Sequence, residues 1–436
     1  MSDNIYEALS RTALLIDLDV FACTADRRLI VDGLRATTAR IVADRDSLGC
    51  AAGQTALVTL YAQLAMTGLQ IDLDAPPVAL VAPQPPLRGS DLLSGLSDYS
   101  NDLLPGGSSR PSATPDVVFV LGGAPGPEET VRVSGGPWRA FAGHRSPVLP
   151  WRGDAPVGAM AAAAAAAAEG VRAAVPTIAE HLGRPAPDDP RWRRLPNRQI
   201  ALDLARYQVD HGLALGEVDV ISGGAITNAA LYALLRVPGL STSIRVIEPD
   251  RLAVSNLNRY ALALRSMLTW SKTRALARFA TDNVKIIGHN KTFDDTTAPG
   301  LHPLAPRILV GVDQIPSRWA AQRQATSNWA CVGSSSHDYV LLSAHPPGAA
   351  CAGCVHPHDD DFTGDIPTIS FVSFWAGLTQ ALELMAHAAG RTPNYARSTH
   401  LWPLGLENPR GIHTFPQQPA MDCPIACHAS TRRQAA

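Results

Sequence analysis

The sequence predicts an α/β protein built from two Rossmann-like halves, and three observations support this fold class. A proline- and arginine-rich stretch at 183–196 divides the 436-residue chain near its middle, where no helix can continue. Hydrophobic strands alternate with helical segments on both sides of it. Finally, Gly-Asp-Ala-Pro at 153–156 and Gly-Asp-Ile-Pro at 364–367 each precede a long apolar segment. The same four-residue pattern ahead of both segments indicates a duplicated α/β unit.

The first half is expected to span 1–185 and to be followed by a linker at 186–197. Its strands are expected at 38–43, at 69–74, where apolar and polar residues alternate, and at 116–121, which should be a buried strand of a parallel sheet. A turn at 49–53 leads into residues 54–66, which are apolar at helical spacing. The alanine run 161–168 predicts a closely packed helix, because alanine has high helix propensity and allows near approach.

The second half, 198–436, follows the same plan. Its strands are expected at 218–221, 243–247 and 307–312. A turn at 222–228 separates the first of these strands from a helix beginning at 229. Residues 371–387 form a long apolar helix. The first two strands and the turn between them have the layout of a nucleotide-binding unit.

Composition excludes several classes of protein. Hydrophobic residues make up 46% of the chain, and 37 basic side chains balance 39 acidic ones. Such a balance provides no field that would attract nucleic acid or an anionic membrane. There is no uninterrupted apolar run of membrane-spanning length, and the first residues lack the features of a signal peptide. We therefore expect a cytoplasmic protein that binds neither nucleic acid nor membrane.

The turn after the first strand of the second half reads Ser-Gly-Gly-Ala-Ile-Thr-Asn at 222–228. It keeps one glycine of the G-x-G-x-x-G pattern, Gly224, at the position that lets the backbone approach a phosphate. Gly224 and Ala225 are therefore candidate nucleotide contacts. A tight turn without any ligand is the structural alternative.

Charged and polar side chains follow the second strand of this half. Glu248 is placed to accept from ribose hydroxyls, and Asp250 to approach magnesium. Asn256 can donate to phosphate, and Arg259 and Lys272 can neutralise the charge that develops during phosphoryl displacement. The alternative is a solvated loop with surface ion pairs.

Asp313 ends the later strand and is expected at the same carboxyl edge of the sheet, where open α/β folds place their ligands. A carboxylate there is a natural magnesium ligand. Together with the previous set, it predicts a site for a metal-bound triphosphate.

At these residues the chain resembles the ubiquitin-activating-enzyme family, whose bacterial members include the ThiF and MoeB adenylyltransferases. The family shows Asp-x-Asp after the second strand, then Ser-Asn-Leu-x-Arg, a lysine thirteen residues later, and a strand ending in aspartate. The corresponding residues here are Glu248 and Asp250, 255–259, Lys272, and Asp313. The resemblance extends from about 198 to 427. Glutamate replaces the first aspartate, and Ser222 and Thr227 replace the outer glycines.

The resemblance implies a degenerate adenylation half at 1–185 and an active ThiF-type half at 198–436. One chain would then mimic the two-fold dimer that simpler relatives form, and a homodimer of this chain stays open. The implied reaction is attack of a carboxylate on the α-phosphate of ATP, with magnesium bound, giving an acyl-adenylate and pyrophosphate. Arg198 begins an Arg-Gln-Ile like the one that carries the family's trans-acting arginine. Arg27 and Arg28 are the other candidates for completing the site.

By the same resemblance, the carboxylate belongs to a ubiquitin-like or sulfur-carrier protein, or to a peptide. Partners encoded in bacterial ubiquitin-like conjugation operons are the first candidates. Three rival functions stay open: a peptide or small-molecule adenylyltransferase of biosynthesis, an inactive scaffold, and a nicotinamide dehydrogenase. The dehydrogenase leaves Asn256, Arg259, Lys272 and Asp313 unexplained.

Two close cysteine pairs predict a structural zinc site, because four thiolates satisfy tetrahedral coordination and leave no open position. The proposed ligands are Cys351, Cys354, Cys423 and Cys427. His428 is an alternative ligand, and four free thiols are the alternative to a site. Cys331 lies just before an apolar strand, which favours a structural thiol over a thioester nucleophile.

Overall fold

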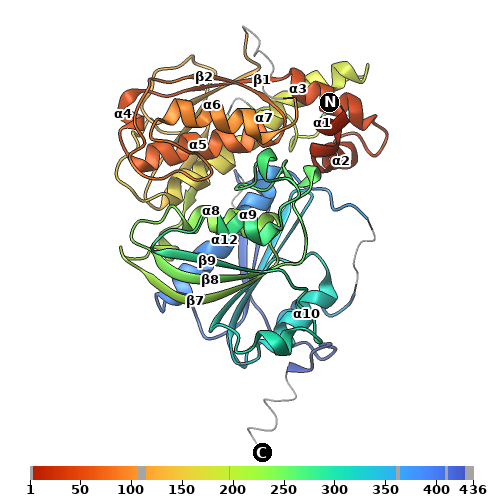
Figure 1. The fold of residues 1–436 in the computed structure, drawn as a ribbon. Coiled ribbons are helices and arrows are strands. Elements are labelled where there is room, and N and C mark those ends of the chain that lie inside the picture. The colour runs from red at the N-terminus through yellow and green to blue at the C-terminus, as the bar shows by residue number, and fades with distance from the viewer. Residues whose placement is uncertain (1–2, 107–113, 196, 360–363, 408–410, 428–436) are drawn as a thin grey trace, which may run out of the picture.

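The computed structural model describes residues 3–106, 114–195, 197–359, 364–407 and 411–427. These residues form two sheets with helices between them (Figure 1). The first half contributes the upper sheet and the second half the lower one. Within the described residues, no helix combines the length and the apolar character needed to cross a membrane.

The first sheet has six strands, and the first four in spatial order run parallel. The order is β2 (Gln70–Asp74), β1 (Thr38–Val42), β3 (Val117–Leu121), β4 (Val131–Gly136), β5 (Arg139–Gly143) and β6 (Gln199–Asp203). The hairpin β4–β5 and strand β6 are antiparallel. The helices of this half are α1 (Asp3–Ala8), α2 (Ser10–Asp19), α3 (Arg27–Ala36), α4 (Arg45–Leu48), α5 (Ala51–Met66), α6 (Leu92–Leu103) and α7 (Val157–His181).

The second sheet has eight strands, five of them parallel. The order is β14 (Ile412–Pro416), β13 (Arg397–Leu401), β12 (Tyr339–His345), β11 (Trp329–Ser336), β10 (Arg307–Val310), β7 (Ala214–Ile221), β8 (Ser241–Ile247) and β9 (Val284–His289). Strands β12, β13 and β14 are antiparallel. The α-helices are α8 (Ala225–Leu234), α9 (Lys272–Ala277), α10 (Ile315–Gln324), α11 (Ala352–Val355) and α12 (Ser370–Ala388).

The two halves share a strand plan, which supports the predicted duplication. Each has a central strand, β1 or β7, with the next strand of the chain on one side. On the other side lie two later parallel strands, β3 and β4 or β10 and β11, and then an antiparallel partner, β5 or β12. Helix α7 follows the Gly-Asp-Ala-Pro segment directly, and α12 begins at Ser370, shortly after the Gly-Asp-Ile-Pro segment. The confirmed fold class is thus two α/β halves with mostly parallel sheets.

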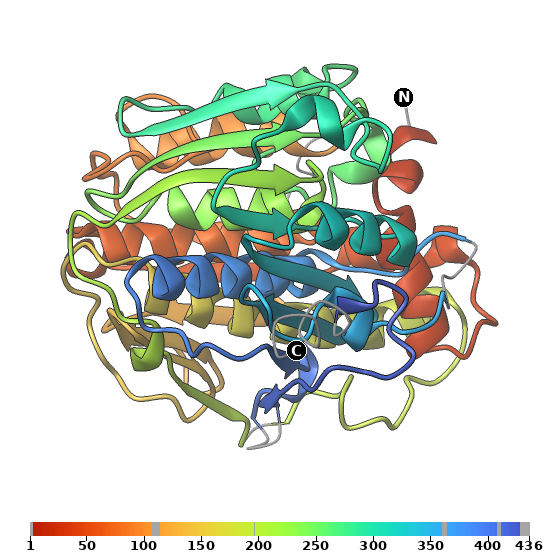
Figure 2. The same cartoon turned by 90° about the horizontal axis from the view of Figure 1, so that it is seen from below.

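The halves are joined by one hydrophobic core that contains residues of α5, α7, α8 and α12. These helices run alongside one another in the view from below (Figure 2). Buried hydrogen bonds cross the junction: the Thr59 and Tyr232 hydroxyls are 2.9 Å apart, and Ser370 Oγ donates to the Gln63 carbonyl. Because the core is continuous, the relative position of the two sheets is fixed by packing.

Several boundaries differ from the sequence-based expectation. Strand β6 lies inside the expected second half, yet it pairs with β5 and completes the first sheet. The sheets therefore divide after Asp203. Helix α8 begins at Ala225, four residues before the expected start. Cys331 lies within strand β11, whose existence was not expected, and the apolar strand β12 follows it.

Candidate active site

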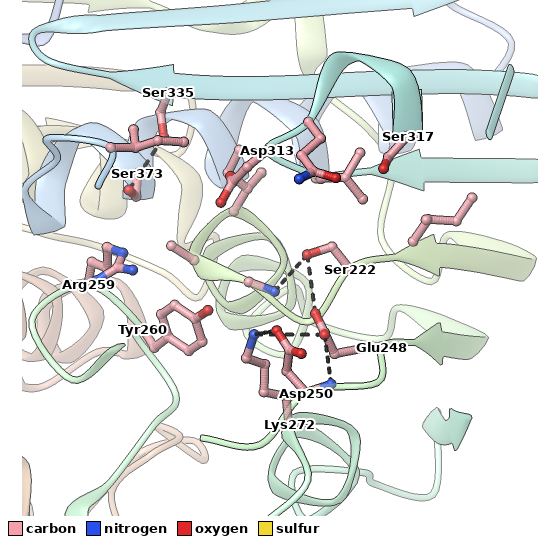
Figure 3. Close-up of a pocket in the computed structure, with 18 of the residues that line it drawn as sticks. Ser222, Glu248, Asp250, Arg259, Tyr260, Lys272, Asp313, Ser317, Ser335 and Ser373 are labelled. Carbon is pink, nitrogen blue, oxygen red and sulfur yellow. Dashed lines mark hydrogen bonds and ion pairs between the residues drawn. The ribbon is translucent and has the colours of Figure 1, made fainter. Parts of the chain in front are cut away.

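A cavity of about 650 Å³ opens at the carboxyl ends of β7, β8 and β10, in front of the N-terminus of α8 (Figure 3). Parallel strands deliver the residues that follow them to one edge, which explains why segments far apart in sequence meet here. The predicted residues that line the cavity are Gly224, Ala225, Glu248, Asp250, Arg259, Lys272 and Asp313. The charged set expected from the sequence is therefore largely brought together.

Glu248 organises the glycine turn through its carboxylate. The side chain is buried, with one oxygen accepting from the Gly223 N–H at 2.7 Å and the other from the Asp250 N–H at 3.0 Å. Charge-assisted hydrogen bonds of this kind are among the stronger ones in proteins. Both carboxylate oxygens thus bond to the backbone, and the ribose contact expected for Glu248 stays a prediction.

The turn itself is held by the residues that replace the usual glycines. Ser222 adopts a positive φ of 99°, and its hydroxyl accepts from the Gly224 N–H at 3.0 Å. Thr227 donates from its hydroxyl to the Ser222 carbonyl at 2.7 Å. The N–H groups of Gly223 and Gly224, which a phosphate would otherwise meet, therefore already have partners in this structure.

Lys272 begins α9 and faces the cavity between two carboxylates (Figure 3). Its ammonium lies 2.9 Å from Asp250 Oδ2 and 3.8 Å from Glu248 Oε1. Burial lowers the pKa of Lys272, but attraction by Tyr260, Glu248 and Asp250 outweighs that effect, so the pKa is raised overall. The lysine is positively charged at neutral pH.

Arg259 supplies a second cation on the opposite side of Tyr260 (Figure 3). Its Nη1 donates to the Ser255 carbonyl and, at 2.8 Å, to Asn258 Oδ1. Burial lowers the pKa of Arg259, but a guanidinium remains protonated at neutral pH. Its anchored position means that a ligand would meet a preformed charge.

Asp313 follows β10. Of the two carboxylates predicted to bind magnesium, Asp250 and Asp313, only Asp313 has no ion pair with a cation among the described residues. Arg318 Nη2 donates to its main-chain carbonyl at 3.0 Å, which fixes the backbone. Its side chain is exposed and lines the cavity. By contrast, the Asp250 carboxylate is paired with Lys272. A carboxylate with its oxygens available fits a magnesium ligand.

Two predicted residues lie away from the cavity. Asn256 accepts from the Ala253 N–H at 2.9 Å and caps the short helix at 254–256. Arg198 is buried, where its Nη2 donates to the Pro190 carbonyl and its other nitrogens lie 3.6 Å from Glu169 and Glu407. Neither residue lines the cavity.

Arg27 and Arg28 are engaged elsewhere in the first half. Arg27 pairs with Asp17 at 3.1 Å, and the Arg28 guanidinium lies over the Tyr6 ring. Neither arginine lines the cavity.

Arg11, on α2 of the first half, lines the cavity and was not singled out from the sequence. Its Nη2 lies 2.8 Å from Asp365 Oδ1, while its buried Nε has no hydrogen-bond partner within the described chain. No motif surrounds Arg11, so its position could be recognised only once α2 was placed against the second half. The cavity is thus built from both halves.

The four predicted zinc ligands come together at α11 and the segment 423–427. Their sulfur atoms all lie within 4.8 Å of one another, with neighbouring pairs at 3.3 to 3.8 Å. Zinc with four thiolates at about 2.3 Å places sulfurs about 3.8 Å apart. The cluster therefore fits a tetrahedral zinc ion. His428 lies outside the described residues.

Cys331 is fully buried, and burial raises the pKa of its thiol well above the usual value. A thioester nucleophile needs an accessible thiolate. The structure therefore confirms Cys331 as a packed residue of β11.

No protein-family profile matches the chain. The uncharacterized protein y4jF of Sinorhizobium fredii (strain NBRC 101917 / NGR234) is 30% identical over 152 residues, which are 34% of this chain and 29% of that protein. The chain thus matches less than a third of that curated relative.

Solved structures of MccB resemble part of the chain. E. coli MccB with ATP matches at TM-score 0.40 and 16% identity, over 48% of this chain and 65% of that chain. The microcin C7 biosynthetic enzyme MccB with N-formylated MccA matches at 0.41 and 15%, over 48% and 67%. PaaA matches at 0.36 and 13%, over 47% and 64%. At these scores the likeness carries no argument about activity.

Proposed function

We propose that this chain is an ATP-dependent adenylyltransferase of the ThiF/MoeB kind. The observation that carries the proposal is the cavity itself. It combines the cations Arg259 and Lys272 with the Asp313 carboxylate, which has no ion-pair partner within the described residues, at the strand ends where α/β folds bind nucleotides. A hydride-transfer site would not need this set of charges.

In the proposed reaction, a substrate carboxylate oxygen attacks the α-phosphorus of ATP. The bond between that phosphorus and the oxygen bridging to the β-phosphate breaks, which yields an acyl-adenylate and pyrophosphate. Arg259 and Lys272 stabilise the charge that moves onto the leaving pyrophosphate. Asp313 would hold magnesium, which neutralises phosphate charge when bound. Arg11 brings a third cation from the first half.

The acyl donor we propose is the C-terminal carboxylate of a peptide, or of a ubiquitin-like or sulfur-carrier protein. The motif resemblance supports this class. The buried position of Cys331 further favours release of the adenylate to another acceptor over capture by that thiol. The cysteine cluster would then be a structural zinc site.

The test is ATP–pyrophosphate exchange with substituted proteins. Arg259→Ala and Lys272→Ala should each lower the exchange rate about 100-fold, the usual effect of removing one preorganised charge. Lys285→Ala is the matched control, because Lys285 is an exposed cation of β9 outside the cavity. An exchange rate equal to that of the wild type in Arg259→Ala or Lys272→Ala would contradict the proposed adenylyltransferase activity.

An inactive scaffold is the second candidate, and one observation favours it. The Ser222 hydroxyl and the Glu248 carboxylate already bond to the turn N–H groups that a phosphate would meet. Under this alternative the chain keeps the fold and the cysteine cluster but binds no ATP. Calorimetric titration of the wild-type protein with ATP decides between the two candidates.

A further inference from the structure

Tyr260 presents a hydroxyl to the cavity from a rigid position. The residue follows Arg259, lines the cavity and is 5% exposed. Its main-chain N–H donates to the Asn256 carbonyl at 3.1 Å, and its own carbonyl accepts from the Ala263 N–H at 2.9 Å. The Arg259 guanidinium lies 5.5 Å from its ring centroid. The main-chain bonds fix the backbone at Tyr260, and the hydroxyl is directed into the cavity (Figure 3).

The Tyr260 hydroxyl has no hydrogen bond to any residue that the structure describes, and it is open to the cavity although the residue as a whole is buried. Its oxygen lies near the turn: a β-carbon added to Gly224 would lie 3.8 Å from it. Lys272 and Arg259 flank the ring on its two sides. Burial raises the pKa of Tyr260, so the hydroxyl keeps its proton and can donate.

The groups around the Tyr260 hydroxyl indicate which kind of acceptor could take a hydrogen bond from it. Two cations beside it favour an anion, and the helix α8, whose N-terminus faces the cavity, favours one as well. Yet the N–H groups of Gly223 and Gly224 are engaged by Glu248 and Ser222. A bound polyphosphate would therefore draw its donors from side chains and from the first N–H groups of α8, which no side chain within the described residues caps.

We propose that the Tyr260 hydroxyl donates a hydrogen bond to a non-bridging phosphate oxygen of the bound nucleotide, in place of the turn N–H groups. This inference rests on the proposed function, because it takes the cavity to be the ATP site. In this arrangement Tyr260 contacts a phosphate of the nucleotide and contacts neither the adenine nor the ribose. Loss of the hydroxyl should therefore weaken ATP and leave adenosine unaffected.

The experiment compares three proteins by calorimetric titration: wild type, Tyr260→Phe and Tyr232→Phe. Tyr260→Phe removes the hydroxyl and keeps the ring. Tyr232→Phe removes another buried hydroxyl, one that bonds to Thr59 outside the cavity. The ligands are a non-hydrolysable ATP analogue and adenosine. Thermal unfolding of each protein confirms that it is folded.

The expected result is a loss of at least about tenfold in affinity for the ATP analogue in Tyr260→Phe, the effect of one hydrogen bond to a charged group. Adenosine binding should be unchanged in Tyr260→Phe, and Tyr232→Phe should match wild type with both ligands. Equal affinity of wild type and Tyr260→Phe for the analogue overturns the inference alone. An equal loss with adenosine also overturns it. Failure of the wild-type protein to bind the analogue overturns the proposed function, and this inference with it.

Discussion

Glu248 shows how one buried carboxylate can organise a site. It joins the glycine turn to the loop that carries Asp250, and it lies 3.8 Å from the Lys272 ammonium. A buried carboxylate is costly unless it is hydrogen-bonded and paired, and Glu248 is both. The position of the Lys272 ammonium thus depends in part on this residue. Glu248 also accepts the hydrogen bond of the Gly223 N–H. The hydroxyl of Ser222, a residue with a positive φ, accepts that of the Gly224 N–H.

Ser222→Gly should strengthen ATP binding several-fold. The substitution frees the Gly224 N–H for a phosphate oxygen, and glycine adopts the positive φ of this position without a steric penalty. Ala22→Gly is the control, because Ala22 also has a positive φ but lies outside the cavity. It should leave affinity unchanged. Weaker ATP binding by Ser222→Gly in calorimetry would mean that the serine hydroxyl positions the turn for the nucleotide.

At the scale of elements, the cysteine cluster joins α11 to the segment 423–427. Helix α11 has four residues, too few to be stable without tertiary contacts. The cluster brings two sulfurs from each segment together. A metal bound there would therefore act as a cross-link between these two segments, in addition to the contacts of α11 with α10.

The purified protein should contain about one zinc per chain. Cys354→Ser and Cys423→Ser should lose the metal and unfold at lower temperature, since structural zinc binding is linked to folding. Cys23→Ser is the control, because Cys23 is exposed and lies outside the cluster. Elemental analysis with thermal unfolding measures both effects. Absence of metal, with the four cluster thiols reacting freely under native conditions, would contradict the site.

Local patterns predicted the elements that depend on nearby residues. Strands β1, β2, β3 and β8 lie within a residue or two of the expected ranges, because each is a short apolar or alternating segment that local sequence reveals. Residues 199–203 were placed in the second half and not expected as a strand, since the pairing of β6 with β5 is a contact between distant segments. Asn256 was expected to donate to a phosphate, but its amide oxygen accepts from the Ala253 N–H and the residue does not line the cavity, so its ligand role stays a prediction. The spacing of residues along the sequence does not show which distant strands pair or which side chains form local caps.

For the whole molecule, the main consequence of the duplication is a site that neither half forms alone. Arg11 from the first half reaches the cavity of the second half and pairs with Asp365 ahead of α12. Asn258, next to Arg259, is fully buried and donates to Thr12 Oγ1 at 2.9 Å. Helix α2 is thus held against the loop that carries a cavity cation.

Arg11→Ala should lower pyrophosphate exchange by about 10- to 100-fold, because it removes a preorganised charge from the cavity. Arg27→Ala is the matched control: Arg27 belongs to the same half and pairs with Asp17 away from the cavity. It should keep nearly the full rate. If the rate falls in Arg27→Ala and not in Arg11→Ala, the assignment of the contributing arginine is wrong.

The central claim is that this chain activates a carboxylate with ATP, and pyrophosphate exchange in the presence of defined carboxylates tests it most directly. The substrates are pooled peptides with free C-termini, the same peptides with amidated C-termini, and the low-molecular-mass protein fraction of the native host. We predict magnesium-dependent exchange with a free-acid pool or the protein fraction, and none with the amidated peptides. Equal exchange with amidated peptides, or no exchange with any substrate while a nicotinamide dinucleotide binds tightly, would contradict the account.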